Sequence, residues 1–240
     1  MTVIGLFSVK GAPGTTTVAT ALAACQPSQN AVLIEADPAG GDLAMRLGIS
    51  QQPGLAQLAA RLCSTASDRS VFDGSARYVA RGGFELVMAP VQPLAAQAAL
   101  EVLAQAGPLL TSASRARSVI LDLGRADGSE PSMALANCCD VLAIVLRGDV
   151  SSIGHVREAD WVSRIRRPVG FVLVDSGPYR APEAAEALAI ACLGQIPFGR
   201  HQPHTRKGAK AVARLRGRLV AAATGTQIAE VEQLSEVSAG

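Results

Sequence analysis

The chain has 240 residues, of which 49% are apolar and 18% are charged, and its formal net charge is +2. This apolar content excludes a disordered chain and is enough for one sizeable core. The small net charge excludes a protein whose whole surface attracts nucleic acid. The five cysteines are odd in number and form no CxxC pair, which argues against a disulfide framework and a zinc cluster.

The apolar segments of the chain are short. The opening residues MTVIGLFSVKG have no basic leader before the apolar run, which is not typical of a secreted protein. The strand-like run from Val141 to Leu146 is far shorter than a membrane span. We therefore expect a soluble, cytoplasmic protein without a stable membrane anchor.

Apolar runs alternate with helix-like stretches along the chain. Most runs lack strict alternation, as expected of strands covered on both faces. This order predicts right-handed crossovers and a three-layer α/β fold, with helices flanking a mainly parallel, twisted sheet. The expected strands are Val3–Phe7, Ala31–Ile34, Phe84–Met88, Ser118–Leu121, Val141–Leu146 and Val169–Val174. The expected helices are Thr15–Cys25, Leu55–Leu62, Leu94–Gln105, Ile153–Arg166 and Ala181–Ala191.

The first expected strand is followed by a loop, KGAPGTTT, that opens a helix. The backbone N–H groups of such a loop point at an anion, helped by the helix N-terminus. Gly11 and Gly14 have no Cβ, so the backbone can approach a phosphate closely. A threonine hydroxyl in the first turn can cap the helix or bind Mg²⁺. By composition alone, many strand-to-helix turns look similar.

The order of residues in this loop resembles the deviant Walker A motif of the ParA/MinD family, KGGxGKTT. Thr15 stands where the family has the lysine that grips phosphate, so the Walker A lysine is missing. Ala12 also departs from the pattern. The positions that match are Lys10, Gly11, Gly14, Thr16 and Thr17.

Other segments resemble the same family in the same order over most of the chain. VLIEADPAGGDLAMRLG resembles its second strand and switch I. Glu35 stands at the position of the first aspartate of that motif, and Asp37 at the position of the second. SVILDLGRADG resembles its switch II strand, with Asp122 at the Walker B position. VGFVLVDSGPYR has Asp175 where the family has an asparagine that contacts adenine.

The resemblance implies a P-loop domain that binds ATP or ADP with Mg²⁺. It implies that Thr16 and Asp122 bind the metal ion and that Asp37 positions the attacking water. It further implies that Lys10 contacts the phosphates of the partner subunit in a dimer. Structural interpretations remain open: Asp122 as a cap, Asp37 as the start of an Asp-Pro turn, Lys10 as a solvated loop residue. The implied nucleotide contacts are Gly11, Ala12, Pro13, Gly14, Thr15, Thr16, Thr17 and Asp175.

The departures from the family pattern predict a slow or degenerate ATPase. A charged hydrogen bond to phosphate is worth about 1.5–3 kcal/mol, so Thr15 should weaken affinity roughly 10- to 150-fold. The loss in the transition state should be larger. Glu35 and Asp175 are two more departures at positions expected to face the nucleotide, and aspartate cannot donate to an adenine ring nitrogen. Two interpretations of Arg125 remain open, a cation contributed to the site and an exposed turn residue, of which the second is expected.

The region near the C-terminus is locally basic. Between Glu186 and Glu230 there is no acidic residue, and four basic residues recur every four positions, which gathers them on one face of a helix. Such a face is usually solvated, but it could contact DNA weakly and non-specifically. We place the P-loop ATPase-like domain in residues 1–224 and a C-terminal tail or short amphipathic helix in residues 225–240. The four basic residues are Arg206, Lys210, Arg214 and Arg218.

Within the family, the loop and the ADPAGGDLA segment look closest to actinobacterial MinD-like proteins, which are similar to TadZ and CpaE. The resemblance implies a homodimer that positions or recruits a protein partner, such as division, partitioning, or pilus or secretion machinery. Two alternatives remain. One is a nucleotide-independent pseudo-ATPase scaffold, and the other is a ParA-type partition ATPase that binds DNA non-specifically.

Overall fold

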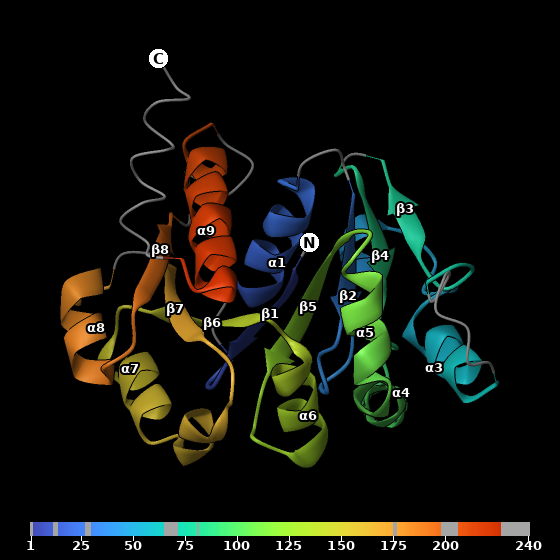
Figure 1. Cartoon of the computed structure of the whole chain (residues 1–240), viewed down its shortest axis with the longest axis horizontal. Helices are drawn as coiled ribbons and strands as arrows, with labels where there is room; N and C mark the ends of the chain where they lie inside the picture. Colours follow the sequence, from blue (N-terminus) through green and yellow to red (C-terminus); the bar gives the residue numbers. More distant parts are fainter. Residues whose placement is uncertain are drawn as a thin grey trace.

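The computed structural model describes residues 2–11, 14–26, 30–64, 72–80, 82–174, 177–197 and 206–226. The strands in this part of the chain form one eight-stranded sheet in the order β3-β4-β2-β5-β1-β6-β7-β8 (Figure 1). All neighbours are parallel except β3 and β4, which run antiparallel. The strands are β1 (Val3–Ser8), β2 (Ala31–Glu35), β3 (Arg77–Val79), β4 (Phe84–Val87), β5 (Ser118–Arg125), β6 (Val141–Arg147), β7 (Val169–Val174) and β8 (Cys192–Ile196).

Helices cover both faces of the sheet, because successive side chains of a strand point to opposite faces and the central strands are apolar on both. Ile4 and Ile120 belong to a core shared with α1, α2 and α9, and α1 packs beside α9 (Figure 1). Val3 and Val119 belong to a second core that is shared with the helices from α3 to α8. The helices are α1 (Thr15–Ala24), α2 (Leu43–Leu47), α3 (Leu55–Ser64), α4 (Pro93–Gln105), α5 (Gly107–Ala113), α6 (Glu130–Cys138), α7 (Val150–Arg157), the 3₁₀ helix η3 (Asp160–Arg164), α8 (Ala181–Leu188) and α9 (Arg206–Thr224).

The expected fold class is confirmed, and all six expected strands are present. The apolar pattern misses β3, a three-residue edge strand, and β8, whose sequence CLGQI mixes apolar residues with glycine and glutamine. It also misses the short helices α2, α5 and α6.

The prediction of one helix over Ile153–Arg166 is wrong. Helix α7 ends at Arg157, and Ala159 has ψ 77°, outside the helical region, before η3 begins at Asp160. This break returns the chain toward the sheet, so that Val156 and Val162 are both buried.

Helix α9 is held against β8 and α1 by apolar and polar contacts. Its side chains Val212, Leu215 and Leu219 are buried. Nη1 of Arg216 donates to the carbonyl of Cys25 at 2.9 Å, and Nη1 of Arg218 donates to the carbonyl of Leu193 at 3.5 Å. The expected basic stripe is therefore partly used for packing.

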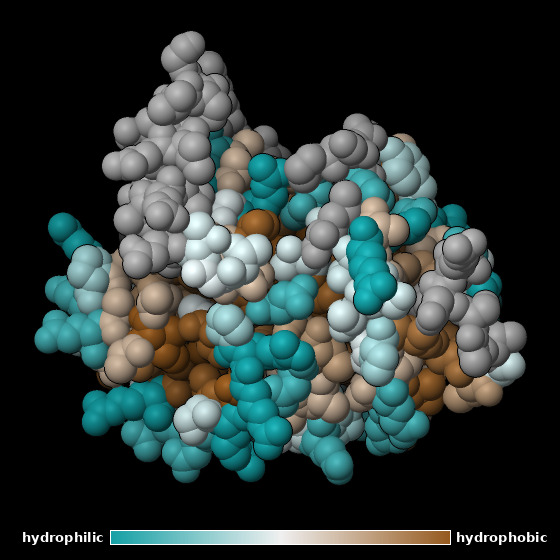
Figure 2. Space-filling model, viewed as in Figure 1, coloured by the Kyte–Doolittle hydropathy of each residue, from teal (hydrophilic) through white to brown (hydrophobic). Residues whose placement is uncertain are grey.

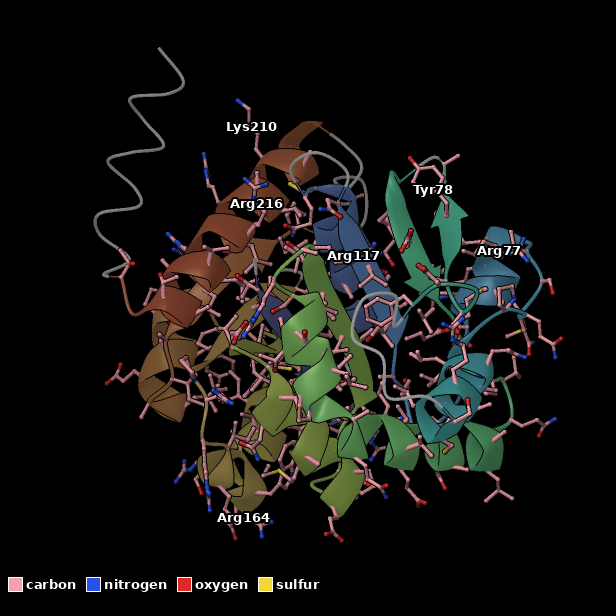
Figure 3. The ribbon with its side chains drawn as sticks, turned by 45° about the vertical axis from the view of Figure 1, so that its right-hand side comes forward. Arg77, Tyr78, Arg117, Arg164, Lys210 and Arg216 are labelled. Atoms are coloured by element: carbon pink, nitrogen blue, oxygen red, sulfur yellow. The ribbon has the colours of Figure 1, made fainter. Side chains whose placement is uncertain are left out.

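The remaining basic residues of α9 differ from these two. Lys207, Lys210 and Arg214 are exposed, and Lys210 extends away from the ribbon in Figure 3. The helix ends at Thr224, and the domain boundary after this residue stays a prediction. The Arg206 side chain and residues 227–240 lie outside the described residues, so the tail or amphipathic helix stays a prediction.

The surface in Figure 2 is hydrophilic along its lower border, while hydrophobic residues show near β7. A hollow of about 420 Å³ lies in this part of the fold, lined by residues that include Val156, Val162, Val169 and Ile190. Among the described residues, no helix combines the length and apolar character that crossing a bilayer requires.

Candidate functional site

The loop between β1 and α1 depends on two glycines in the left-handed region. Gly11 has φ 84° and Gly14 has φ 122°, values that side chains with a Cβ rarely adopt. Gly14 is also the N-cap of α1, its carbonyl accepts from the N–H of Val18 at 2.8 Å, and no side-chain hydrogen bond caps the helix. Backbone N–H groups of the first turn are therefore available to an anion.

Asp122 lies on β5 with a side chain that is 0% exposed. Its Oδ1 accepts from the N–H of Gly124 at 3.2 Å, whereas its Oδ2 has no hydrogen-bond partner among the described residues. Burial raises the pKa of Asp122 to about 7; the nearby Thr16 hydroxyl opposes this rise, and the nearby charges of Glu35 and Asp37 reinforce it. A buried carboxylate oxygen without a partner is costly unless a cation or proton reaches it.

The chemistry of Thr16 and Asp122 fits a Mg²⁺ ion. The orphaned Oδ2 atom and the hydroxyl beside it are oxygen donors, which Mg²⁺ prefers. Among the described residues, no group of three or more His, Cys, Asp or Glu side chains could hold a metal ion. Mg²⁺ commonly binds through one or two protein oxygens and completes its coordination with phosphates and water.

Asp37 is packed against the turn that follows Asp122. Its Oδ1 accepts from the N–H of Ala39 at 2.8 Å, which is an Asx turn as expected for Asp-Pro. Gly124 has φ 56°, and a Cβ on it would overlap the Asp37 carboxyl group. Burial raises the pKa of Asp37, while hydrogen bonds from the N–H groups of Ala39 and Arg125 lower it. The structure thus brings Thr16, Asp37 and Asp122 together.

Glu35 is not open to a nucleotide, contrary to the expectation from the sequence. Its side chain is 2% exposed, and Oε1 accepts from the N–H groups of Asp42 at 2.7 Å and Leu43 at 2.9 Å. Its Oε2 accepts from the N–H of Ala89 at 3.1 Å. The extra methylene of glutamate lets the carboxylate reach the start of α2 and the end of β4, so Glu35 holds the loop that contains Asp37.

Lys10 turns toward α7. Its Nζ donates to Oγ of Ser151, and Lys10 and Gly11 line a pocket of about 550 Å³ together with Asp149 and Ser152. Asp149 caps α7 by accepting from the N–H of Ser152 at 2.7 Å, and this bond chiefly lowers the pKa of Asp149, with Arg147 and Lys10 adding to the effect.

Sequence reasoning missed the role of this α7 cap. The signal was present in the segment GDVSS, where an aspartate precedes a serine by three residues at a helix start.

The other residues that the sequence analysis assigns to the nucleotide site lie in different places. Thr15 is 4% exposed, at the first position of α1. Thr17 lines a different, mainly apolar cavity of about 750 Å³ bordered by α1, α2 and α9. Ala12, Pro13 and Asp175 lie outside the described residues, so their contacts stay predictions.

Neither a scan against protein-family models nor a search of curated proteins finds a match to this sequence. Solved structures with the same fold are found. A ParA family ATPase from Chlorobium tepidum is 17% identical with a TM-score of 0.69, over 93% of this chain and 96% of that one. The cell division ATPase MinD of Pyrococcus furiosus is 16% identical with a TM-score of 0.68, over 91% and 98%.

A third similar structure is a complex of a Cyanothece McdA variant with ATP, which is 16% identical with a TM-score of 0.62, over 95% and 97%. At these identities the similarity establishes the fold, which is that of the ParA and MinD type of P-loop NTPase.

Replacing Glu35 by alanine should destabilise the fold. The buried N–H groups of Leu43 and Ala89 would lose their acceptor, at about 1–3 kcal/mol each, so we expect the free energy of unfolding to fall by at least about 2 kcal/mol. Urea denaturation measures it. Glu101→Ala removes an exposed carboxylate of α4 and serves as the matched control. Equal losses in the two variants would show that the three hydrogen bonds do not stabilise the fold.

Replacing Asp122 by asparagine should stabilise the nucleotide-free protein in chelator, increasingly so at higher pH. Because the folded-state pKa of about 7 exceeds the unfolded one, wild-type stability falls as pH rises from about 4 to 7. This loss of wild-type stability is on the order of 4 kcal/mol in total, and the variant does not incur it because asparagine carries no charge. Thermal melting from pH 4 to 8 measures the difference, with the exposed Asp160→Asn as control. A stabilisation that does not grow with pH would contradict the raised pKa.

Proposed function

We propose that this chain, whose fold is that of the ParA and MinD ATPases, is a nucleotide-dependent switch. It binds Mg-ATP at the loop between β1 and α1, dimerises when ATP is bound, and positions or recruits a protein partner in the cell. Hydrolysis is slow because Thr15 is uncharged at the position where the family motif has a lysine.

The observation that supports nucleotide binding best is the orphaned Oδ2 of Asp122. A purely structural aspartate would have both oxygens satisfied, as Glu35 has. Asp122 instead keeps one oxygen buried without a described partner, next to the Thr16 hydroxyl. The free energy cost of this arrangement is offset when a divalent cation binds there.

The residues of the chain have separable roles in this proposal. The glycines at 11 and 14 open the loop to the phosphates, and Thr16 and Asp122 hold Mg²⁺, which neutralises charge on the phosphates when bound. Asp37 lies beside Gly124 at the same edge of the sheet, where a carboxylate can orient water. Its raised pKa makes it a better proton acceptor than an ordinary aspartate.

Lys10 has the position for a contact between subunits. It is exposed on the loop, and its bond to Ser151 directs it toward the pocket at the start of α7. An ATP-bound dimer would exchange this serine contact for the phosphates of the partner subunit. The partner that is positioned would belong to division, partitioning, or pilus or secretion machinery.

The two alternatives differ in what they require. A nucleotide-independent scaffold needs only the fold, and nothing in it uses the buried oxygen of Asp122. A DNA-binding partition ATPase needs the basic face of α9, but Arg216 and Arg218 donate to backbone carbonyls of the domain itself. Lys210 and Arg214 remain exposed for a weak contact.

Calorimetric titration of Mg-ATP tests the proposal. We expect binding by the wild-type protein, binding weakened at least about tenfold in Asp122→Ala, and unchanged affinity in the exposed control Asp160→Ala. Lys10→Ala should reduce ATP-dependent dimerisation, measured by sedimentation, whereas Lys207→Ala on α9 should not. No binding at millimolar Mg-ATP would refute the switch and leave the scaffold.

A further inference from the structure

The phosphate-binding loop has no cation of its own at the start of α1. Thr15 takes the first helical position and is 4% exposed. Two basic side chains near the loop have partners at the start of α7. Lys10 donates to Ser151, and Nε of Arg147 lies 4.0 Å from Oδ2 of Asp149. A triphosphate needs a positive charge here, because its own charge is not neutralised by Mg²⁺ alone.

Arg125 is brought to this loop by an irregularity in the pairing of β1 with β5. Leu6 is opposite Asp122, but Ser8 is opposite Arg125, so β5 has one residue more than β1 in this interval. Gly124, with φ 56°, lies within this interval in the left-handed region, which a residue without a Cβ adopts readily. Without this irregularity, Ser8 would be opposite Gly124 instead.

Hydrogen bonds to Ser8 hold the backbone on both sides of Arg125. Oγ of Ser8 donates to the carbonyl of Gly124 at 3.3 Å, and the N–H of Ala126 donates to the carbonyl of Ser8 at 3.0 Å. Ser8 is the last residue of β1 before the loop. The backbone of Arg125 is therefore fixed next to the residue from which the phosphate-binding loop departs.

The side chain of Arg125 lies beside Gly11. Its Cδ would lie 3.8 Å from a Cβ built on Gly11, and the residue is exposed. Within the described part of the chain, no hydrogen bond or ion pair engages its guanidinium group. Arg125 thus differs from Lys10 and Arg147, because its charge is available to a ligand at Gly11.

We infer that Arg125 binds the phosphates of the nucleotide and replaces the charge that Thr15 does not supply. This inference rests on the proposed function and adds a phosphate-binding residue to the same site. An arginine suits the task, since its planar fork can bind two phosphate oxygens and stays charged at any physiological pH. The positive side chain thus comes from the end of β5 and not from the start of α1.

Calorimetric titration of Mg-ATP into Arg125→Gln tests the inference. Losing a charged hydrogen bond to phosphate should weaken binding roughly 10- to 150-fold. Arg115→Gln is the matched control, because Arg115 is exposed shortly before β5 begins, at the other end of the strand. It should bind Mg-ATP as the wild type does. Equal thermal stability of the two variants without nucleotide shows that both are folded.

A second variant asks whether the charge itself matters. Adding Thr15→Lys to Arg125→Gln should restore at least part of the lost affinity, a recovery that a merely structural role of Arg125 would not give. If the wild type binds Mg-ATP and Arg125→Gln binds equally well, the inference about Arg125 is wrong while the proposed function stands. If the wild type does not bind, both are wrong.

Discussion

The burial of the Asp122 carboxylate within β5 is the constraint on which the site depends. The side chain has no exposed surface, and only one of its oxygens has a described hydrogen-bond partner. Such a group is costly in a folded protein. The adjacent strands β1 and β2 pair with β5 on both sides, and the carboxylate lies beside Thr16 at the start of α1.

The alternation of side chains along β5 explains why Asp122 lies beside the start of α1. Ile120 packs in the core on the face that α1 covers, and Asp122 is two residues further along, on the same face. Leu121 and Leu123 belong to the other core. One strand thus contributes apolar packing to both faces while presenting a carboxylate to the helix that begins at the glycine loop.

Glu35 and Asp122 show how the same chemical group takes different roles in neighbouring strands. The two residues are opposite each other in the pairing of β2 with β5. Glu35 has both oxygens satisfied by backbone N–H groups, so it stabilises the loop that holds Asp37. Asp122 has an oxygen without a described partner, so it can accept a metal ion. Length decides the difference, because the longer side chain reaches Asp42, Leu43 and Ala89.

The sequence by itself determined the alternation of strands and helices, the glycine loop after the first strand, and the carboxylates on β2 and β5. These are local properties, set by apolar runs and by glycine and threonine at fixed spacing. The contact of Asp37 with Gly124 and the turn of Lys10 toward Ser151 were decided only by the tertiary structure. So was the approach of Arg125 to Gly11, because it depends on one extra residue in β5, and a change of register between strands far apart in sequence leaves no mark in the local pattern.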